Sequence, residues 1–124
     1  MKKVMSPAEQ LTEFLNFVDQ CTTEYRLACD TVSEEDKHLQ DLLHGIEFSV
    51  NRSEADKELT KLRRSRKVRR ENKDAVKRYQ LIVEFFNDQN NRATFNKMRQ
   101  LLGRQRKEEE FLNSKRFYKP RASS

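Results

Sequence analysis

The sequence has no tryptophan, and its 124 residues include only two glycines, two prolines and two cysteines. A sheet protein needs turn residues such as Gly and Pro about every 8 to 12 residues, so their scarcity argues against strands. Hydrophobic residues make up 35% of the chain and charged residues 37%. This composition is typical of long helices, in which a narrow apolar stripe is enough for packing. At this length we expect one domain at most.

Long apolar runs are missing as well. No run approaches the roughly 18 apolar residues of a membrane-spanning helix, and the basic start at residues 1–3 is followed by an amphipathic segment rather than by the apolar part of a secretion signal. Cys21 and Cys29 lie on one expected helix, about 12 Å apart along its axis, which is too far for a disulfide. We therefore expect a cytoplasmic protein with reduced thiols and no membrane partner.

The apolar residues of the first half follow the 3-4 spacing of a helix that packs along one side. Ser6 can cap the free N–H groups of such a helix, and Pro7 fits its first turn. A seven-residue period then runs over about five heptads, which favours one coiled-coil-like helix at 7–47. Glu35 interrupts its seam, and the cap-like run at 33–36 leaves a kink near Val32 open. The predicted seam consists of Leu11, Phe14, Val18, Tyr25, Val32, Leu39, Leu42 and Ile46.

Two further helices are predicted. Weak helix formers at 48–53 indicate a turn, after which Ser53 can cap a helix at about 54–86. Short polar side chains at 87–91 compete for backbone hydrogen bonds and are expected to end it. A third helix follows at about 92–114, before a basic and mobile tail at 115–124. The seam of the second helix includes Ser65 and Asn72 and ends with Tyr79, Ile82 and Phe86.

These patterns predict an all-α fold. We expect a long antiparallel helical hairpin, coiled-coil-like, with a third C-terminal helix, forming a single domain over residues 1–114. The seams are long but contain few large apolar residues to close them, so we also expect a homo-oligomer that buries part of the stripe against a second copy.

Charge is divided unevenly between the two halves of the chain. Residues 1–60 carry 6 Lys and Arg against 13 Asp and Glu, a balance of −7, and residues 61–124 carry 20 against 7, a balance of +13. The two balances add up to the net charge of +6. Such asymmetry indicates a basic surface for an anionic partner, or an acidic helix that lies against a basic one. Both can hold at once, because −7 cannot neutralise +13.

A basic stripe lies in the second predicted helix, within the run KLRRSRKVRRENKDAVKR at residues 61–78. Its members fall in one 3-4 row, about 160° around the helix from the apolar seam, so we expect them to face solvent. Like charges on adjacent turns repel one another, and a phosphate backbone would relieve that repulsion. The planar Arg side chain suits phosphate because it can donate two hydrogen bonds to it. The basic stripe is Arg63, Arg66, Arg70, Lys73 and Lys77, flanked by the two cations Arg64 and Lys67.

A structural explanation of the same residues stays open. Charge runs on long helices are usually solvated faces, and the first helix offers acidic neighbours that could form salt bridges with the stripe. These are Glu24, Asp30, Glu34, Asp41 and Glu47.

Two motifs in the first helix have the Glu-x-x-His type of spacing found in di-iron helix bundles. They are Glu35-x-x-His38 and Asp41-x-x-His44. In di-iron bundles the motifs come from different helices, whereas here they share one helix and point about 120° apart. We therefore expect no metal and no cofactor. The sequence also has no Gly-rich phosphate loop, no Cys/His cluster and no nucleophile–base pairing, so we expect no enzymatic activity.

Three segments together resemble a group of known proteins: the run QDLLHGIEF at residues 40–48, the basic helix after it, and the run RFYKPR at residues 116–121. They are similar to small all-helical proteins encoded by phages and prophages of Gram-positive bacteria, which are generally of uncharacterised function. The resemblance covers most of the chain from about residue 33 onward. It implies a phage or prophage origin, and hence the cytoplasm of a bacterial host cell, together with an all-α fold, and it provides no catalytic residue.

The leading hypothesis is a non-enzymatic, phage-type accessory protein that binds DNA or RNA through the basic stripe. Because that face lacks aromatic side chains for base stacking, we expect contacts to the backbone and little sequence preference. The alternative is a protein-binding regulator or counter-defence inhibitor, whose stripe would occupy an acidic surface of a host nucleic-acid-handling protein. A purely structural coiled-coil component is a third interpretation.

Overall fold

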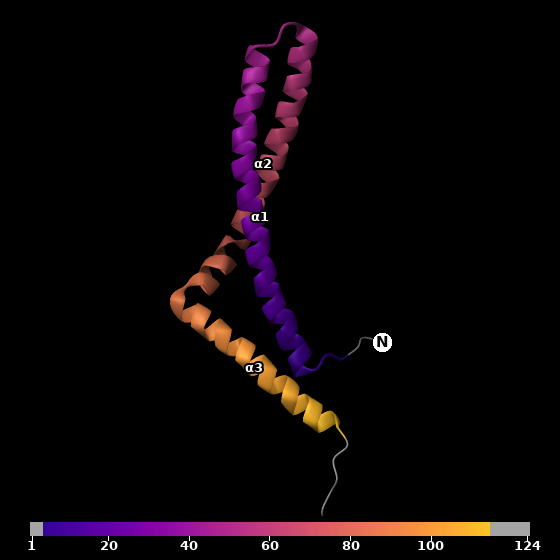
Figure 1. Ribbon diagram of the computed structural model, residues 1–124, viewed down its shortest axis with the longest axis vertical. Helices are drawn as coiled ribbons and strands as arrows, with labels where there is room; N and C mark the ends of the chain where they lie inside the picture. The colour runs from indigo at the N-terminus through magenta and orange to yellow at the C-terminus, as the bar shows by residue number, and fades with distance from the viewer. Residues whose placement is uncertain (1–3, 115–124) are drawn as a thin grey trace, which may run out of the picture. The chain divides into compact units, whose positions relative to one another are not determined.

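In a computed structural model, residues 4–114 are described, and they form three α-helices (Figure 1). Helix α1 spans Pro7–Glu47, α2 spans Arg52–Asn87 and α3 spans Gln89–Asn113. No strand occurs between residues 4 and 114. The predicted all-α fold with a helical hairpin and a third helix is therefore confirmed. The predicted basic tail at 115–124 lies outside the described residues.

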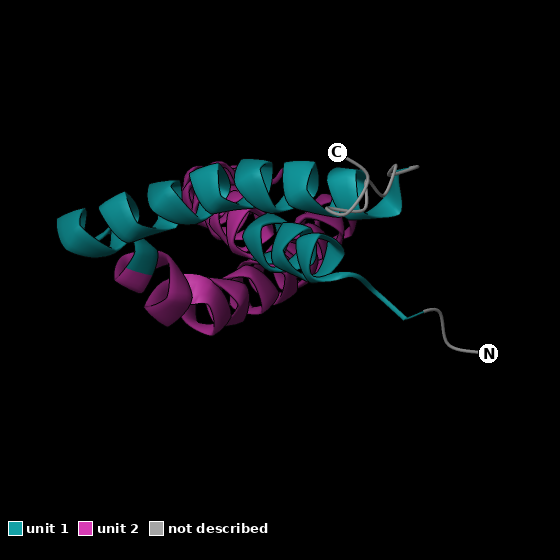
Figure 2. Ribbon diagram, turned by 90° about the horizontal axis from the view of Figure 1, so that it is seen from below, with its two compact units in different colours: residues 1–17, 86–124 teal, residues 18–85 magenta. Residues whose placement is uncertain are grey.

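The contacts divide the chain into two compact units, which Figure 2 shows in different colours. Unit 1 combines Met1–Phe17 with Phe86–Ser124, and unit 2 is Val18–Phe85. Because α1 and α2 each contribute to both units, a unit boundary falls inside each of these helices. The prediction of one domain over residues 1–114 stays a prediction.

Unit 2 is an antiparallel hairpin of α1 and α2, joined by residues 48–51 (Figure 1). At the start of α2, the Asn51 Oδ1 atom accepts a hydrogen bond from the Glu54 N–H at 2.9 Å. The Glu54 carboxylate in return accepts one from the Val50 N–H at 3.0 Å. The arrangement resembles a capping box, except that Val50 rather than the cap residue Asn51 donates to Glu54, and it satisfies two otherwise free donors. Asn51 rather than the predicted Ser53 caps the helix, so α2 begins at Arg52 instead of residue 54.

The hairpin buries small and aliphatic side chains from both helices. Buried residues of unit 2 are Val18, Cys21, Ala28 and Leu42 from α1, and Leu62, Ser65 and Val83 from α2. The other predicted seam residues of this unit are half-buried: Tyr25, Val32, Leu39, Ile46, Tyr79 and Ile82. Helix α1 runs through Val32 without interruption. Small buried residues such as Cys21 and Ala28 leave little volume between the helices, so α1 and α2 can pack closely.

Unit 1 pairs the first turns of α1 with α3 through an aromatic cluster. The Phe14 and Phe86 rings are 6.2 Å apart in an edge-on arrangement, and the Phe86 and Phe95 rings are 5.3 Å apart. Such edge and tilted contacts are the preferred geometry for aromatic pairs. The guanidinium of Arg99 lies over the Phe95 ring, 4.8 Å from its centre. Ala8, Leu15, Phe95 and Leu102 are buried, Leu11 and Phe86 are half-buried, and Phe14 keeps 39% of its surface exposed.

The break between α2 and α3 is shorter than the sequence indicated. Only Asp88 separates Asn87, the last residue of α2, from Gln89, the first residue of α3. The Asp88 carboxylate accepts a hydrogen bond from the Asn90 N–H at 3.1 Å, and its backbone carbonyl accepts one from Arg92 at 2.8 Å. The polar run at 87–91 is therefore not a five-residue loop. It contains the N-cap residue Asp88, and α3 begins at the following residue.

The carboxylate of Glu109 on α3 caps the start of α1. It accepts a hydrogen bond from the Ala8 N–H at 2.8 Å, and it is also hydrogen-bonded to Ser6 and to Gln105. A negative charge at a helix N-terminus is favourable because the free N–H groups there carry partial positive charge. The hydrogen bond to Ser6, followed by those to Gln105 and Ala8, lowers the pKa of Glu109, although partial desolvation opposes the shift.

This cap makes the stability of unit 1 dependent on pH. Because the pKa of Glu109 is lowered in the folded state, its stabilising contribution is present above the unfolded value of about 4.3 and is lost as the pH falls through the folded pKa. We expect Glu109→Gln to melt at a lower temperature than the wild type at pH 7. The difference in melting temperature between the two proteins should shrink as the pH falls below about 4.3. Thermal unfolding followed by circular dichroism over a pH series measures both effects.

Glu108→Gln is the matched control, because Glu108 is the exposed neighbour of Glu109 on the same helix. It should melt close to the wild type at every pH. A Glu109→Gln variant with wild-type stability at pH 7 would show that the cap does not hold α3 against α1.

Candidate nucleic-acid interface

The basic stripe lies on α2 within unit 2. Its five members and the flanking Arg64 and Lys67 are all exposed. Among the described residues, none of these seven cations forms an ion pair with an acidic side chain. The repulsion between cations on adjacent turns is therefore not relieved by a direct ion pair in the described chain. An external anion that bridges several of the seven cations would lower that repulsion.

An acidic residue of α1, Asp36, forms an ion pair with a cation of α2 that is not part of the basic stripe. The one ion pair that joins α1 to α2 in residues 4–114 links the Arg69 Nε atom to the Asp36 carboxylate. Arg69 is half-buried at the edge of the hairpin, four residues after the buried Ser65. Sequence analysis missed Arg69, although its spacing of four from Ser65 and three from Asn72 places it on the seam side of the helix. The acids expected to neutralise the stripe form no ion pair with it among the described residues.

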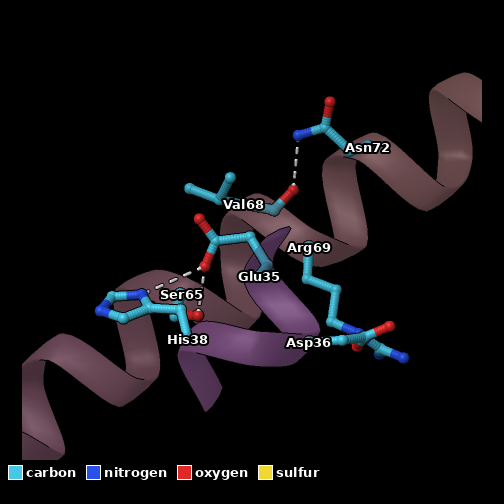
Figure 3. Close-up of polar contacts among 7 residues, drawn as sticks. All are labelled: Glu35, Asp36, His38, Ser65, Val68, Arg69 and Asn72. Atoms are coloured by element: carbon cyan, nitrogen blue, oxygen red, sulfur yellow. Dashed lines mark hydrogen bonds and ion pairs between the residues drawn. The ribbon is translucent and has the colours of Figure 1, made fainter. Parts of the chain in front are cut away.

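Figure 3 shows the polar contacts that hold the two helices in register. The Ser65 hydroxyl donates a hydrogen bond to the Glu35 carboxylate, and the His38 Nδ1 atom lies 3.6 Å from the same carboxylate oxygen. Ser65 is buried, with 6% of its surface exposed. A buried hydroxyl that lost its partner would carry a desolvation cost, so this contact favours one alignment of α1 against α2. The basic stripe is thus presented by a helix whose position along α1 is fixed.

The same three residues do not form a catalytic triad. In a Ser-His-Asp site the serine donates to the histidine, which then takes its proton. Here Ser65 donates to the Glu35 carboxylate, and His38 also lies against that carboxylate. Ser65 keeps only 6% of its surface exposed. The contact between Ser65 and Glu35 links α2 to α1.

The two histidine motifs lie apart on α1. His38 is next to Glu35, whereas the His44 Nδ1 atom lies 4.0 Å from the Glu47 carboxylate and its ring stacks on Phe48 at 6.2 Å. Within residues 4–114, no group of three or more His, Cys, Asp or Glu side chains could hold a metal ion.

A groove lies beside the C-terminal half of the stripe, between α1 and α2 of unit 2. Its volume is about 490 Å³. Cys29 and Val32 line it from α1, and Arg70, Lys73, Asp74, Val76, Lys77 and Gln80 line it from α2. Three members of the stripe therefore line a concave surface together with the apolar side chains of Cys29, Val32 and Val76, which we call the apolar floor of the groove. The sequence did not indicate this groove, since it depends on how the two helices are rotated against each other.

Tyr25 and Cys29 are neighbours on α1, one turn apart. A hydrogen bond between their side chains raises the pKa of Tyr25, and the nearby charges of Cys29 and Glu84 act in the same direction. Burial raises the pKa of the Cys21 thiol. Cys21 is buried in unit 2, whereas Cys29 lines the groove. The chemical reactivity of Cys21 therefore probes the interior of unit 2, and that of Cys29 probes the groove.

In comparisons with known proteins, the chain matches no family model, no curated protein and no solved structure. Among the described residues, no helix combines the length and apolar content needed to cross a membrane.

Proposed function

We propose that this protein is a non-enzymatic accessory protein of the phage type, which binds the backbone of nucleic acid through the basic stripe of α2. The observation that carries the proposal is the stripe itself. Its five cations and the two that flank it are exposed on one helix, and none of the seven forms an ion pair among the described residues. A polyanion with regularly spaced charges is the partner that such a row fits best.

The stripe suits phosphate contacts better than recognition of base sequence. Arg63, Arg66 and Arg70 can each donate two hydrogen bonds to a phosphate. Of the aromatic residues of α2, Tyr79 and Phe86 are half-buried, whereas Phe85 keeps 58% of its surface exposed and follows the last cation of the stripe by eight residues. Contacts to phosphates fix position but carry no direct sequence information, so binding should tolerate many sequences.

The test is a titration of the wild-type protein with random-sequence duplex DNA at several salt concentrations. If about five phosphates are contacted, each contact releases close to one counterion, and log affinity should fall with log salt at a slope of roughly −4 to −5. Fluorescence anisotropy of a labelled duplex measures the slope.

A second duplex of unrelated sequence is the control, and its affinity should be similar. No detectable binding to either duplex or to single strands at low salt would overturn the proposal. The alternative, a regulator or inhibitor that places the stripe on an acidic protein surface, would then take its place.

A further inference from the structure

We infer that the groove beside the stripe takes an unstacked base of a single-stranded nucleic acid, while Arg70, Lys73 and Lys77 hold the adjoining phosphates. The inference rests on the proposed function and adds the class of nucleic acid to it. Its basis is the juxtaposition, on one face of unit 2, of an apolar-floored groove and three members of the stripe.

The floor of the groove fits the flat, weakly polar face of a base. Cys29, Val32 and Val76 supply apolar surface from both helices. The volume of about 490 Å³ lies within the range of roughly 300 to 1,000 Å³ that is usual for small-molecule sites. A base that leaves water for this surface gains hydrophobic contact without any sequence-specific hydrogen bond.

The rim of the groove supplies the polar groups that a nucleotide needs. Lys73 and Lys77 lie one helical turn apart, so two cations face the same short stretch of backbone. The planar guanidinium of Arg70 can bind a phosphate or stack on a base. Asp74 and Gln80 also line the groove, and the Gln80 amide donates a hydrogen bond to the Glu84 carboxylate at 2.8 Å.

A single strand fits this site better than a duplex does. In a duplex the bases are stacked inside, and extruding one costs a few kcal/mol of unpairing and unstacking. In a single strand the bases are free to turn toward an apolar surface while the phosphates follow the cations. Duplex DNA can contact the stripe, but it cannot fill the groove at little cost.

The length of the apolar floor favours a nucleic acid over an acidic peptide. A bound amphipathic helix needs apolar anchors over two or more turns, in the pattern i, i+3 or i+4, i+7. Here the apolar floor is three residues, whereas the cations extend from Arg63 to Lys77. A long row of cations beside a short apolar surface matches a polymer with one charge for each base.

The experiment compares three labelled ligands with the same number of phosphates: an oligothymidylate, an abasic strand that has the backbone but no bases, and a duplex. The oligothymidylate should bind on the order of tenfold more tightly than the abasic strand, because only it can place a base in the groove. It should also bind more tightly than the duplex. Titrations by fluorescence anisotropy at one low salt concentration give the three affinities.

A variant that makes the groove polar, Val76→Gln, tests the location. It should reduce the preference for oligothymidylate over the abasic strand to near unity and leave the affinity for the abasic strand unchanged, because it removes apolar surface without adding an aromatic ring on which a base could stack. Val50→Gln is the matched control, since Val50 lies in the turn between α1 and α2 with 86% of its surface exposed. It should keep the preference.

The thiol of Cys29 provides a readout in the wild-type chain, which decides the matter even if Val76→Gln fails to fold. Oligothymidylate should slow alkylation of Cys29, whereas the abasic strand should not. The buried Cys21 is the internal reference, because it reacts only when the hairpin opens. Peptide mass spectrometry separates the two sites.

The outcomes distinguish this inference from the proposed function. Equal affinities for oligothymidylate and the abasic strand would overturn the inference and leave backbone binding in place. Absence of binding by all three ligands at low salt would overturn both. Protection of Cys29 by an acidic amphipathic peptide, but not by oligothymidylate, would also overturn the inference and assign the groove to a protein partner.

Discussion

Replacing Leu42 by Ala is expected to lower the free energy of unfolding by about 2 to 5 kcal/mol. Leu42 keeps only 4% of its surface exposed in unit 2. The substitution removes buried apolar surface and leaves a cavity that the closely packed hairpin can fill only in part. A domain of ordinary stability has about 5 to 15 kcal/mol in total, so the variant should lose a large part of its margin. Urea unfolding followed by circular dichroism measures the change.

Leu43→Ala is the matched control, because Leu43 is the next residue on α1 and keeps 47% of its surface exposed. It should cost much less than Leu42→Ala, since less surface returns to water and no cavity forms. Leu39→Ala should fall between the two, in line with the half-buried position of Leu39. Equal losses for Leu42 and Leu43 would mean that α1 is rotated differently against α2.

The length of α1 could be predicted because its determinants are local. A cap at Ser6 and a seven-residue period require only the spacing of neighbouring residues along one helix. The Ser6 hydroxyl accepts a hydrogen bond from the Glu9 N–H at 3.2 Å, as a cap should. The predicted ends of α2 and α3 were less accurate. Asn51 and Asp88 cap these helices in the structure, but nearby residues of similar chemistry are also candidates for the cap in the sequence.

Glu35 illustrates how an apparent defect in one helix is explained only by its partner. In the sequence it interrupts the apolar seam of the first helix, and Ser65 is a polar residue in the seam of the second. In the structure the Ser65 hydroxyl donates to the Glu35 carboxylate, so the two polar positions satisfy each other. A single helix pattern contains no information about which position of the other helix lies opposite.

Contacts between residues far apart in the chain could not be predicted from the sequence for the same reason. The hydrogen bond from Ala8 to Glu109 joins residues 101 apart, and that between Arg106 and Thr12 joins residues 94 apart. The groove likewise requires Val32 of α1 to lie near Val76 of α2. Helical periodicity indicates which face of a helix is apolar, but the alignment of two helices depends on side-chain packing along both.

Reversing three charges of the stripe should have the largest effect on ligand binding. In an Arg63→Glu, Arg66→Glu, Arg70→Glu variant, three of about five phosphate contacts are removed. The salt slope on duplex DNA should then fall from about −4.5 to about −1.8, because each contact contributes about −0.9. At about 0.1 M salt the same three contacts correspond to a loss of affinity on the order of several hundredfold. Anisotropy titrations of both proteins at several salt concentrations measure slope and affinity together.

A matched variant, Lys97→Glu, Arg104→Glu, Lys107→Glu, makes the same change in net charge on exposed residues of α3. If the stripe is the contact surface, this control should weaken binding far less than the stripe variant, because a charge that touches no phosphate acts only through screened, long-range attraction. Circular dichroism should show both variants as helical as the wild type, since the reversed residues of the stripe are exposed and without ion pairs in the described chain. Unaltered binding by a folded stripe variant, with loss in the α3 variant, would place the interface on α3 and the basic segment at residues 104–121. Equal losses in the two variants would mean that net charge, rather than a defined row of cations on α2, attracts the nucleic acid.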